Sequence, residues 1–215
     1  MNTTPSTERR PITEVVGEVA GAFIADLQRG YLDDRSSAVA ALAQLRRGAG
    51  KVPQDVPELW GVSGTEELLN RQDWSEREKA RAEAAHFLAV TLYALHQQSR
   101  VNQGMHRRGV ELGTAVRRLM PDGDIDEPIR RRFVRLGTAT TGDALAERLR
   151  GIVSLLRREE IPLDYGLLAG QLYQAQLPGG MRQVRQRWGR SFHSYRPNAS
   201  SADTSTKDAP TDKDT

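Results

Sequence analysis

Apolar residues recur at intervals of three and four along nearly every segment of this sequence, which is the spacing of one face of an α-helix. The first such stripe precedes Gly30, which is expected to end its helix, and consists of Ile12, Val15, Val16, Val19, Phe23 and Leu27. No segment shows a convincing alternation of apolar and polar residues, the pattern of a half-buried strand. A chain of 215 residues is long enough to bury a substantial core. We therefore predict an all-α fold, a helical bundle of two packed lobes.

Capping residues divide the rest of the sequence into further helices. Ser75 and Glu78 form the pattern of a capping box at the start of a long helix. Asp143 and Asp164 are expected to cap two later helices, because an aspartate at this position accepts a hydrogen bond from the first turn. The helices predicted after the first span residues 35–47, 75–95, 109–120, 128–137, 143–156, 164–172 and 181–192.

Composition divides the chain into three parts. Residues 1–100 are expected to form an N-terminal helical lobe, and residues 101–196 a basic C-terminal helical lobe. From residue 197 to residue 215 the chain contains no large apolar side chain. Such a segment cannot bury enough surface to offset the entropy lost on folding. Residues 197–215 are therefore predicted to be a disordered tail.

The positive charge is concentrated in the C-terminal half. From Arg100 to Arg196 the chain holds 18 arginines, no lysine and 10 acidic residues, whereas residues 1–99 hold 11 lysines and arginines against 14 acidic residues. This distribution is typical of a surface that binds a polyanion. The alternative is a compositional bias toward arginine, with acidic residues interleaved along solvated helix faces. Between Pro128 and Gly142 that interleaving is absent, because four arginines occur there without an acidic residue.

Several classes of function find no support in the sequence. No apolar run approaches the ~20 residues of a membrane-spanning helix, and the first ten residues lack the apolar segment of a secretory signal. The chain has no cysteine for a disulfide or a thiolate metal site. Residues 48–51 match only part of a phosphate-binding loop, and the four histidines lack a metal-ligand spacing. We therefore expect a cytoplasmic protein without a membrane anchor, catalytic site, metal or cofactor.

Two helices segregate their arginines from their apolar residues. At 100° per residue, the side of helix 128–137 opposite its apolar stripe carries Arg131, Arg132 and Arg135. In helix 181–192, Trp188 belongs to the apolar stripe and is expected in the core, the alternative being that Trp188, Phe192 and Tyr195 stack on bases. The arginines that project away from that stripe or flank it are Arg182, Arg185, Arg187 and Arg190. Guanidinium groups bind phosphate in a bidentate manner and stack on bases, so these faces predict contact with a nucleic-acid backbone.

A series of short sequence strings carries a resemblance to a known family. In order along the chain, the strings are AQLRRG at 43–48, YALHQQS at 93–99, MH at 105–106, LGTAVRRL at 112–119, RRFVRL at 131–136, LRGIV at 149–153, IPLDY at 161–165 and VRQRWGR at 184–190. Their order and spacing resemble the CasB family, the small subunit of the type I-E CRISPR surveillance complex Cascade. The resemblance covers about residues 15–196.

This resemblance implies an all-helical, non-enzymatic subunit of a ribonucleoprotein. The implied partners are the large subunit and the backbone subunits of Cascade, a second copy of the chain, guide RNA, target DNA and the displaced DNA strand. In such systems base pairing supplies sequence specificity, while protein contacts recognise backbone and shape. The candidate nucleic-acid-binding residues are Arg46, Arg47, Arg107, Arg108, Arg117, Arg118, Arg131, Arg132, Arg135, Arg182, Arg185, Arg187 and Arg190.

Alternatives remain open for the chain and for some of these residues. The chain could be a free-standing helical nucleic-acid-binding or regulatory protein, or an enzyme of an unrecognised type. Arg46 and Arg47 end their predicted helix, where cations interact favourably with the helix dipole without any ligand. Arg107 and Arg118 share a helix face with Glu111, so this pair is partly neutralised and fits an ordinary salt-bridge arrangement.

Overall fold

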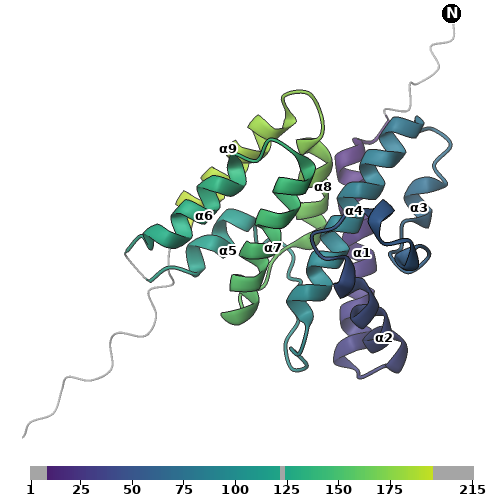
Figure 1. The fold of residues 1–215 in the computed structure, drawn as a ribbon, viewed down its shortest axis with the longest axis horizontal. Coiled ribbons are helices and arrows are strands. Elements are labelled where there is room, and N and C mark those ends of the chain that lie inside the picture. The colour runs from purple at the N-terminus through teal and green to yellow at the C-terminus, as the bar shows by residue number, and fades with distance from the viewer. Residues whose placement is uncertain (1–8, 122–123, 196–215) are drawn as a thin grey trace, which may run out of the picture.

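The computed structural model describes residues 9–121 and 124–195, and within them the predicted all-α fold is confirmed (Figure 1). The helices are α1 (Ile12–Leu32), α2 (Ser36–Leu45), α3 (Glu66–Leu69), α4 (Glu76–Gln97), α5 (Leu112–Arg118), α6 (Glu127–Gly137), α7 (Gly142–Arg158), α8 (Tyr165–Ala175) and α9 (Gly180–Ser194). Three 3-10 turns are η1 (Arg46–Gly48), η2 (Pro53–Asp55) and η3 (Pro57–Leu59). The tail predicted at 197–215 lies outside the described residues.

Helices α1, α4 and α8 lie side by side in the middle of the molecule (Figure 1). Glycines bring the backbones of α1 and α8 into direct contact. A Cβ atom added to Gly166 would lie 2.7 Å from the carbonyl oxygen of Gly17, and one added to Gly170 would lie 2.6 Å from that of Thr13. Because a larger residue has no room at either position, these glycines set the distance between the first and the eighth helix.

One hydrophobic cluster extends through the fold from α1 to α9. Its fully buried members include Val16 of α1, Tyr93 of α4, Leu149 of α7 and Tyr165 of α8. Trp188 of α9 is 2% exposed, which confirms that its indole belongs to the core. Burying a large apolar side chain contributes about 1.5–3 kcal/mol. The predicted division into lobes near residue 100 stays a prediction.

Two predicted helix caps are confirmed. The Ser75 hydroxyl accepts the amide hydrogen of Glu78 at 3.4 Å, and the Glu78 carboxylate accepts that of Ser75 at 2.7 Å. This is the reciprocal arrangement of a capping box at the start of α4. At the start of α8, the Asp164 carboxylate accepts the amide hydrogen of Leu167 at 2.9 Å.

Two other helix ends differ from the predictions. Asp143 lies in the first turn of α7, and the cap is Thr141, whose hydroxyl accepts the amide hydrogen of Ala144 at 3.2 Å. Gly30 does not end α1, which continues for two more residues. An added Cβ at Gly30 would lie 2.8 Å from the Cβ of Ala38 in α2. The small size of Gly30 therefore serves the packing of two helices and not the end of one.

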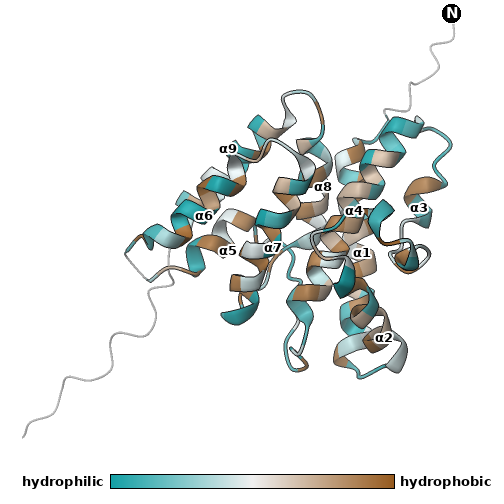
Figure 2. Cartoon of the chain, in the orientation of Figure 1, coloured by the Kyte–Doolittle hydropathy of each residue, from teal (hydrophilic) through white to brown (hydrophobic). Residues whose placement is uncertain are grey.

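Hydrophilic and apolar residues are interspersed along the larger helices (Figure 2). This pattern gives most helices one side toward the core and one side toward solvent. Among the described residues, no helix is both long enough and apolar enough to cross a bilayer.

Candidate nucleic-acid interface

Helix α6 carries the densest group of arginines in the C-terminal half. It begins at Glu127, where the Asp126 carboxylate accepts the amide hydrogen of Ile129 at 2.9 Å. Leu136 is fully buried and Phe133 is half-buried, whereas all four arginines of the helix are exposed. The amphipathic spacing of the sequence thus fixes which side of α6 turns toward solvent.

Helix α9 presents its arginines in the same way. Its buried side consists of Val184, Trp188 and Phe192. The Trp188 indole N–H donates to the Gln171 side-chain oxygen at 2.6 Å, which holds α9 against α8. All four arginines between residues 182 and 190 are exposed.

Most candidate arginines have no acidic partner in the part of the chain that the structure describes. Twelve of the thirteen are exposed, and Arg117 is half-buried. Within residues 9–121 and 124–195, Arg187 is the one candidate that forms an ion pair, with Glu111 at 3.5 Å. Their neighbour Arg130, which is not a candidate, pairs with Glu127 at 2.7 Å. A guanidinium group without a partner is free to exchange its hydration for a phosphate.

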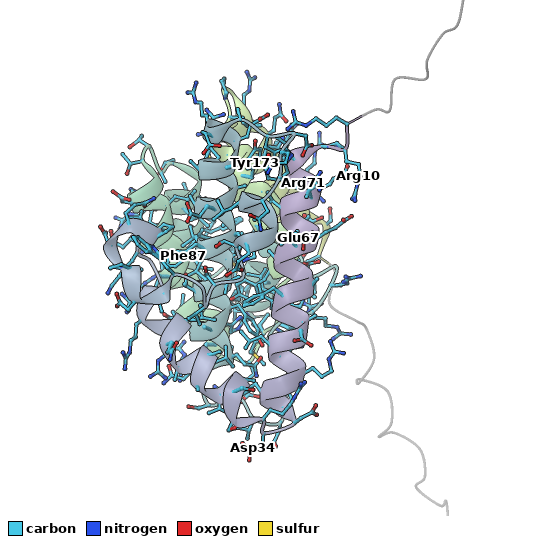
Figure 3. All side chains as sticks on the ribbon, turned by 90° about the vertical axis from the view of Figure 1, so that its right-hand side faces the viewer. Arg10, Asp34, Glu67, Arg71, Phe87 and Tyr173 are labelled. Carbon is cyan, nitrogen blue, oxygen red and sulfur yellow. The ribbon has the colours of Figure 1, made fainter. Side chains whose placement is uncertain are left out.

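The arginines of the N-terminal half are arranged differently. Arg10 pairs with Glu18, and Arg71 pairs with Asp73. Figure 3 shows Arg10, Arg71 and Glu67 near one another beside α1, and all three line one shallow pocket. Positive and negative groups alternate there, so this part of the surface does not favour a polyanion.

A cleft between α6 and α7 collects part of the predicted site. Arg132 and Arg135 of α6 line it together with Arg148 and Glu147 of α7, around a volume of about 470 Å³. The Arg148 guanidinium donates to the carbonyl oxygen of Arg135, which ties the two helices together. Arg131 does not line this cleft, although it belongs to the same exposed side of α6.

The structure does not unite the remaining candidates with this cleft. Arg108 and Arg187 line a pocket of about 490 Å³ beside α1 and α8, where Glu14, Glu18 and Asp164 are also present. This mixture of charges makes the pocket a poorer match for a polyanion than the cleft between α6 and α7.

The candidates on shorter elements make local contacts. Arg46 and Arg47 lie on η1, which packs against α2 and α4. Arg117 donates to the carbonyl oxygen of Pro121 at 3.2 Å. The Arg118 guanidinium lies 5.4 Å from the centre of the Tyr195 ring, a cation–π contact. Arg46, Arg47 and Arg107 are also exposed, but they do not line the cleft between α6 and α7.

A second groove, between α6 and α9, was not predicted from the sequence. The rings of Phe133 and Phe192 stack in it with centroids 5.4 Å apart and planes at 22°. The Arg185 guanidinium donates to the carbonyl oxygen of Gly137 at 3.3 Å across its edge. The groove encloses about 350 Å³. Glycines at 137 and 189, in two helices otherwise rich in arginine, are the signal in the sequence that could have indicated it.

The histidines of the interior serve the fold. The His96 Nδ1 atom lies 2.9 Å from the Tyr165 hydroxyl, and the His106 Nδ1 atom accepts the Tyr165 amide hydrogen at 3.2 Å. Burial lowers the pKa of His96 to about 3 and also lowers the pKa of His106. Among the described residues no cluster of three histidine or acidic side chains is placed to hold a metal ion.

Comparison with known proteins identifies what this arrangement is similar to. The family model of the CRISPR-associated protein Cse2 matches residues 41–193. The crystal structure of CasB from Thermobifida fusca is similar with a TM-score of 0.76 and 51% sequence identity, over 83% of this chain and 98% of that chain. A chain of a CRISPR RNA-guided surveillance complex shares the fold with a TM-score of 0.60 and 20% identity, over 83% of this chain and 96% of that chain. No curated protein matches the sequence.

Proposed function

The chain belongs to the CRISPR-associated Cse2 family, also called CasB, and from this we propose that it is the small, non-catalytic subunit of a type I-E Cascade complex in the cytoplasm. Its proposed protein partners are the large subunit, the backbone subunits and a second copy of the chain. Its proposed nucleic-acid partners are guide RNA, target DNA and the displaced DNA strand. In this role it stabilises the opened target during antiviral defence.

The observation that carries the proposal is a set of exposed arginines on α6 and α9 that have no acidic partner within residues 9–121 and 124–195. Arg131, Arg132 and Arg135 project from α6, and Arg182 and Arg190 project from α9. On a helix face that contacts only solvent, such arginines would be expected to pair with acidic residues three or four positions away. Guanidinium groups in such an arrangement bind successive phosphates and stabilise a strand of any sequence.

The same residues support a role in holding strands and not in reading them. Specific readout of a duplex requires a helix or ribbon that places side chains on base edges in a groove. The arginines of α6 and α9 contact a backbone through charge, so sequence selection is left to base pairing with the guide. A subunit of this kind lengthens the time for which the target duplex stays open.

Co-purification tests this function directly. The chain is co-expressed with a tagged Cascade backbone subunit and guide RNA, and the tagged complex is isolated and probed for the chain. We expect the chain to be retained and to bind single strands only weakly when isolated, because separate surface arginines give little affinity without the rest of the assembly.

The alternative, a free-standing nucleic-acid-binding protein, would give the opposite result in both measurements. If the chain is absent from the tagged complex and binds a nucleic acid tightly alone, the Cascade proposal is rejected in favour of that alternative. Hydrolysis of a nucleic acid or nucleotide by the purified chain would reject the non-catalytic part of the proposal.

A further inference from the structure

The groove between α6 and α9 combines an apolar floor with a positive edge. The stacked rings of Phe133 and Phe192 form part of its lining, and Val134, which is 50% exposed, lies beside them. Arg185 of α9 lines the same groove, as does Arg130 of α6, whose charge is offset by its ion pair with Glu127 at 2.7 Å. No carboxylate is among the lining residues. The groove therefore offers a surface for an apolar ring next to a site for negative charge.

Gly189 keeps this groove open. It lies inside α9, where a glycine destabilises a helix relative to alanine. A Cβ atom added to Gly189 would have no atom within 4 Å, so no close packing requires a glycine at this position. The open space beside Gly189 is the space of the groove itself. A larger side chain there would fill the groove without displacing the core.

We propose that this groove binds one unstacked base of single-stranded DNA. A base presents an apolar ring flanked by phosphates, which matches an aromatic floor beside the guanidinium group of Arg185. Arg182 lies three residues before Arg185 and therefore on the same side of α9, so it extends the positive edge along the path of a strand. A volume of about 350 Å³ lies at the lower end of the 300–1,000 Å³ typical of small-ligand sites.

The proposal rests on the proposed function, because it names the ligand of one part of the same arginine-bearing surface. The displaced strand is the choice among nucleic acids, since its bases are left unpaired while guide and target pair with each other. An apolar side chain of a neighbouring subunit would fit the floor of the groove. It would leave the positive edge without a matching charge, which favours the DNA strand.

The test compares two substitutions at one position. Gly189→Leu fills the groove, and Gly189→Ala is the matched control that leaves most of its volume open. Each full-length protein is titrated with oligothymidine, with oligouridine and with an abasic deoxyribose-phosphate oligomer of the same length and charge. We expect the wild type and Gly189→Ala to bind oligothymidine about ten-fold more tightly than the abasic oligomer, as for one stacked base.

In Gly189→Leu this ten-fold preference should disappear, while affinity for the abasic oligomer and its salt dependence stay unchanged. Thermal unfolding verifies that both variants are folded. Val134→Ser is the second variant, because it removes an exposed apolar wall without filling the groove, and it should also reduce the preference.

Each other outcome has a definite meaning. A preference that survives in Gly189→Leu and Val134→Ser overturns the inference, as does a preference for oligouridine over oligothymidine. Loss of co-purification in Gly189→Leu with an unchanged base preference shows that a protein side chain occupies the groove. Equal binding of base-containing and abasic oligomers by the wild type overturns this inference alone. Absence of binding to all three, in the isolated chain and in the complex, removes the proposed function as well.

Discussion

Three of the four histidines, His86, His96 and His106, lie in the interior of the protein. Burial lowers the pKa of all three below the usual value of 6.5, because a charged imidazole would lose its hydration there. Each is hydrogen-bonded as a neutral ring, as His86 is to the carbonyl oxygen of Ser63 at 2.8 Å. These residues therefore link the stability of the fold to pH.

His96 should make the protein progressively less stable in acid. Burial, aided by the charges of Arg157 and Arg100, holds its pKa at about 3 in the folded state. Between about pH 6.5 and pH 3 the unfolded chain binds a proton at this residue that the folded chain does not. The contribution of His96 to stability is therefore fully present above pH 6.5. Below that pH the free energy of unfolding falls by about 1.4 kcal/mol per pH unit for this one group.

The measurement is urea denaturation at a series of pH values for the wild type and for His96→Asn. The variant should be less stable at neutral pH, since it loses a core contact, yet its stability should fall less steeply between pH 6.5 and pH 4. His193→Asn, a change at an exposed position, is the control and should follow the wild type. Parallel curves for the wild type and His96→Asn would contradict the expectation.

At the scale of elements, the contact between α1 and α8 depends on atoms that glycine lacks. An added Cβ at Gly166 would lie 2.7 Å from the carbonyl oxygen of Gly17 and 3.1 Å from the Cα of Gly21. Both neighbours are backbone atoms, which cannot rotate away as a side chain can. The two helices would have to move apart and loosen the cluster that both help to build.

Gly166→Ala should therefore destabilise the protein by about 1–3 kcal/mol, the usual cost of overpacking a core. Gly151→Ala in α7 is the matched control, because an added Cβ there meets no atom within 4 Å. That change should stabilise the protein by up to about 1 kcal/mol through helix propensity. Chemical denaturation of both variants checks the pair, and a Gly166→Ala protein as stable as the wild type would show that α1 and α8 can separate without cost.

The elements themselves were largely predictable, because periodicity and capping are local properties. The stripe from Ile12 to Leu27 and the capping box at Ser75 indicated α1 and α4 correctly. The pairing of helices was not predictable, because periodicity identifies a buried face without identifying what covers it. Gly30 was misinterpreted as a helix end for this reason, since its role depends on the approach of Ala38 from another helix.

The candidate site, like the fold, was predictable only at the level of single helices. Helical spacing indicated that the arginines of α6 and α9 project outward, and the exposure of Arg131 and Arg190 agrees with that. Their division among a cleft, a groove and a mixed-charge pocket was not predictable, because it depends on how α6 packs between α7 and α9. Arg148 lines the cleft, and Glu111 pairs with Arg187. Both contacts arise where separate elements pack together, so the spacing of residues within one helix could not predict them.

At the scale of the whole molecule, the arginines that are concentrated in the C-terminal half of the sequence also lie together at one end of the fold. Helices α5, α6 and α9 gather at one end of the molecule, while α2 and α3 lie at the other (Figure 1). Eleven arginines of the candidate set belong to α5, α6, α9 or the loop before α5. We expect such an end to attract a polyanion from a distance and to orient it before contact.

Removing two charges from this end should weaken binding of any strand to a similar degree. Arg131→Ala with Arg135→Ala removes two exposed guanidinium groups and leaves the buried side of α6 intact, so stability should change little. For single strands, log K falls with log salt by about 0.7 per phosphate neutralised. If each arginine contacts one phosphate, the slope should flatten by about 1 to 1.4, equally for unrelated sequences. In the assembled complex, the same variant should open target duplex more slowly while guide-RNA loading stays normal.

Arg29→Ala with Arg35→Ala is the matched control for that experiment. It also removes two exposed charges, from the acidic N-terminal half, where Arg29 pairs with Asp26 and Arg35 with Asp33. Oligonucleotide titrations at several salt concentrations should show an unchanged slope for this control. A folded Arg131→Ala, Arg135→Ala variant with the wild-type salt slope and normal duplex opening would place both arginines on a merely solvated face. The nucleic acid would then have to contact other candidates, the first being Arg182 and Arg190, because they are exposed on α9 without an acidic partner among the described residues.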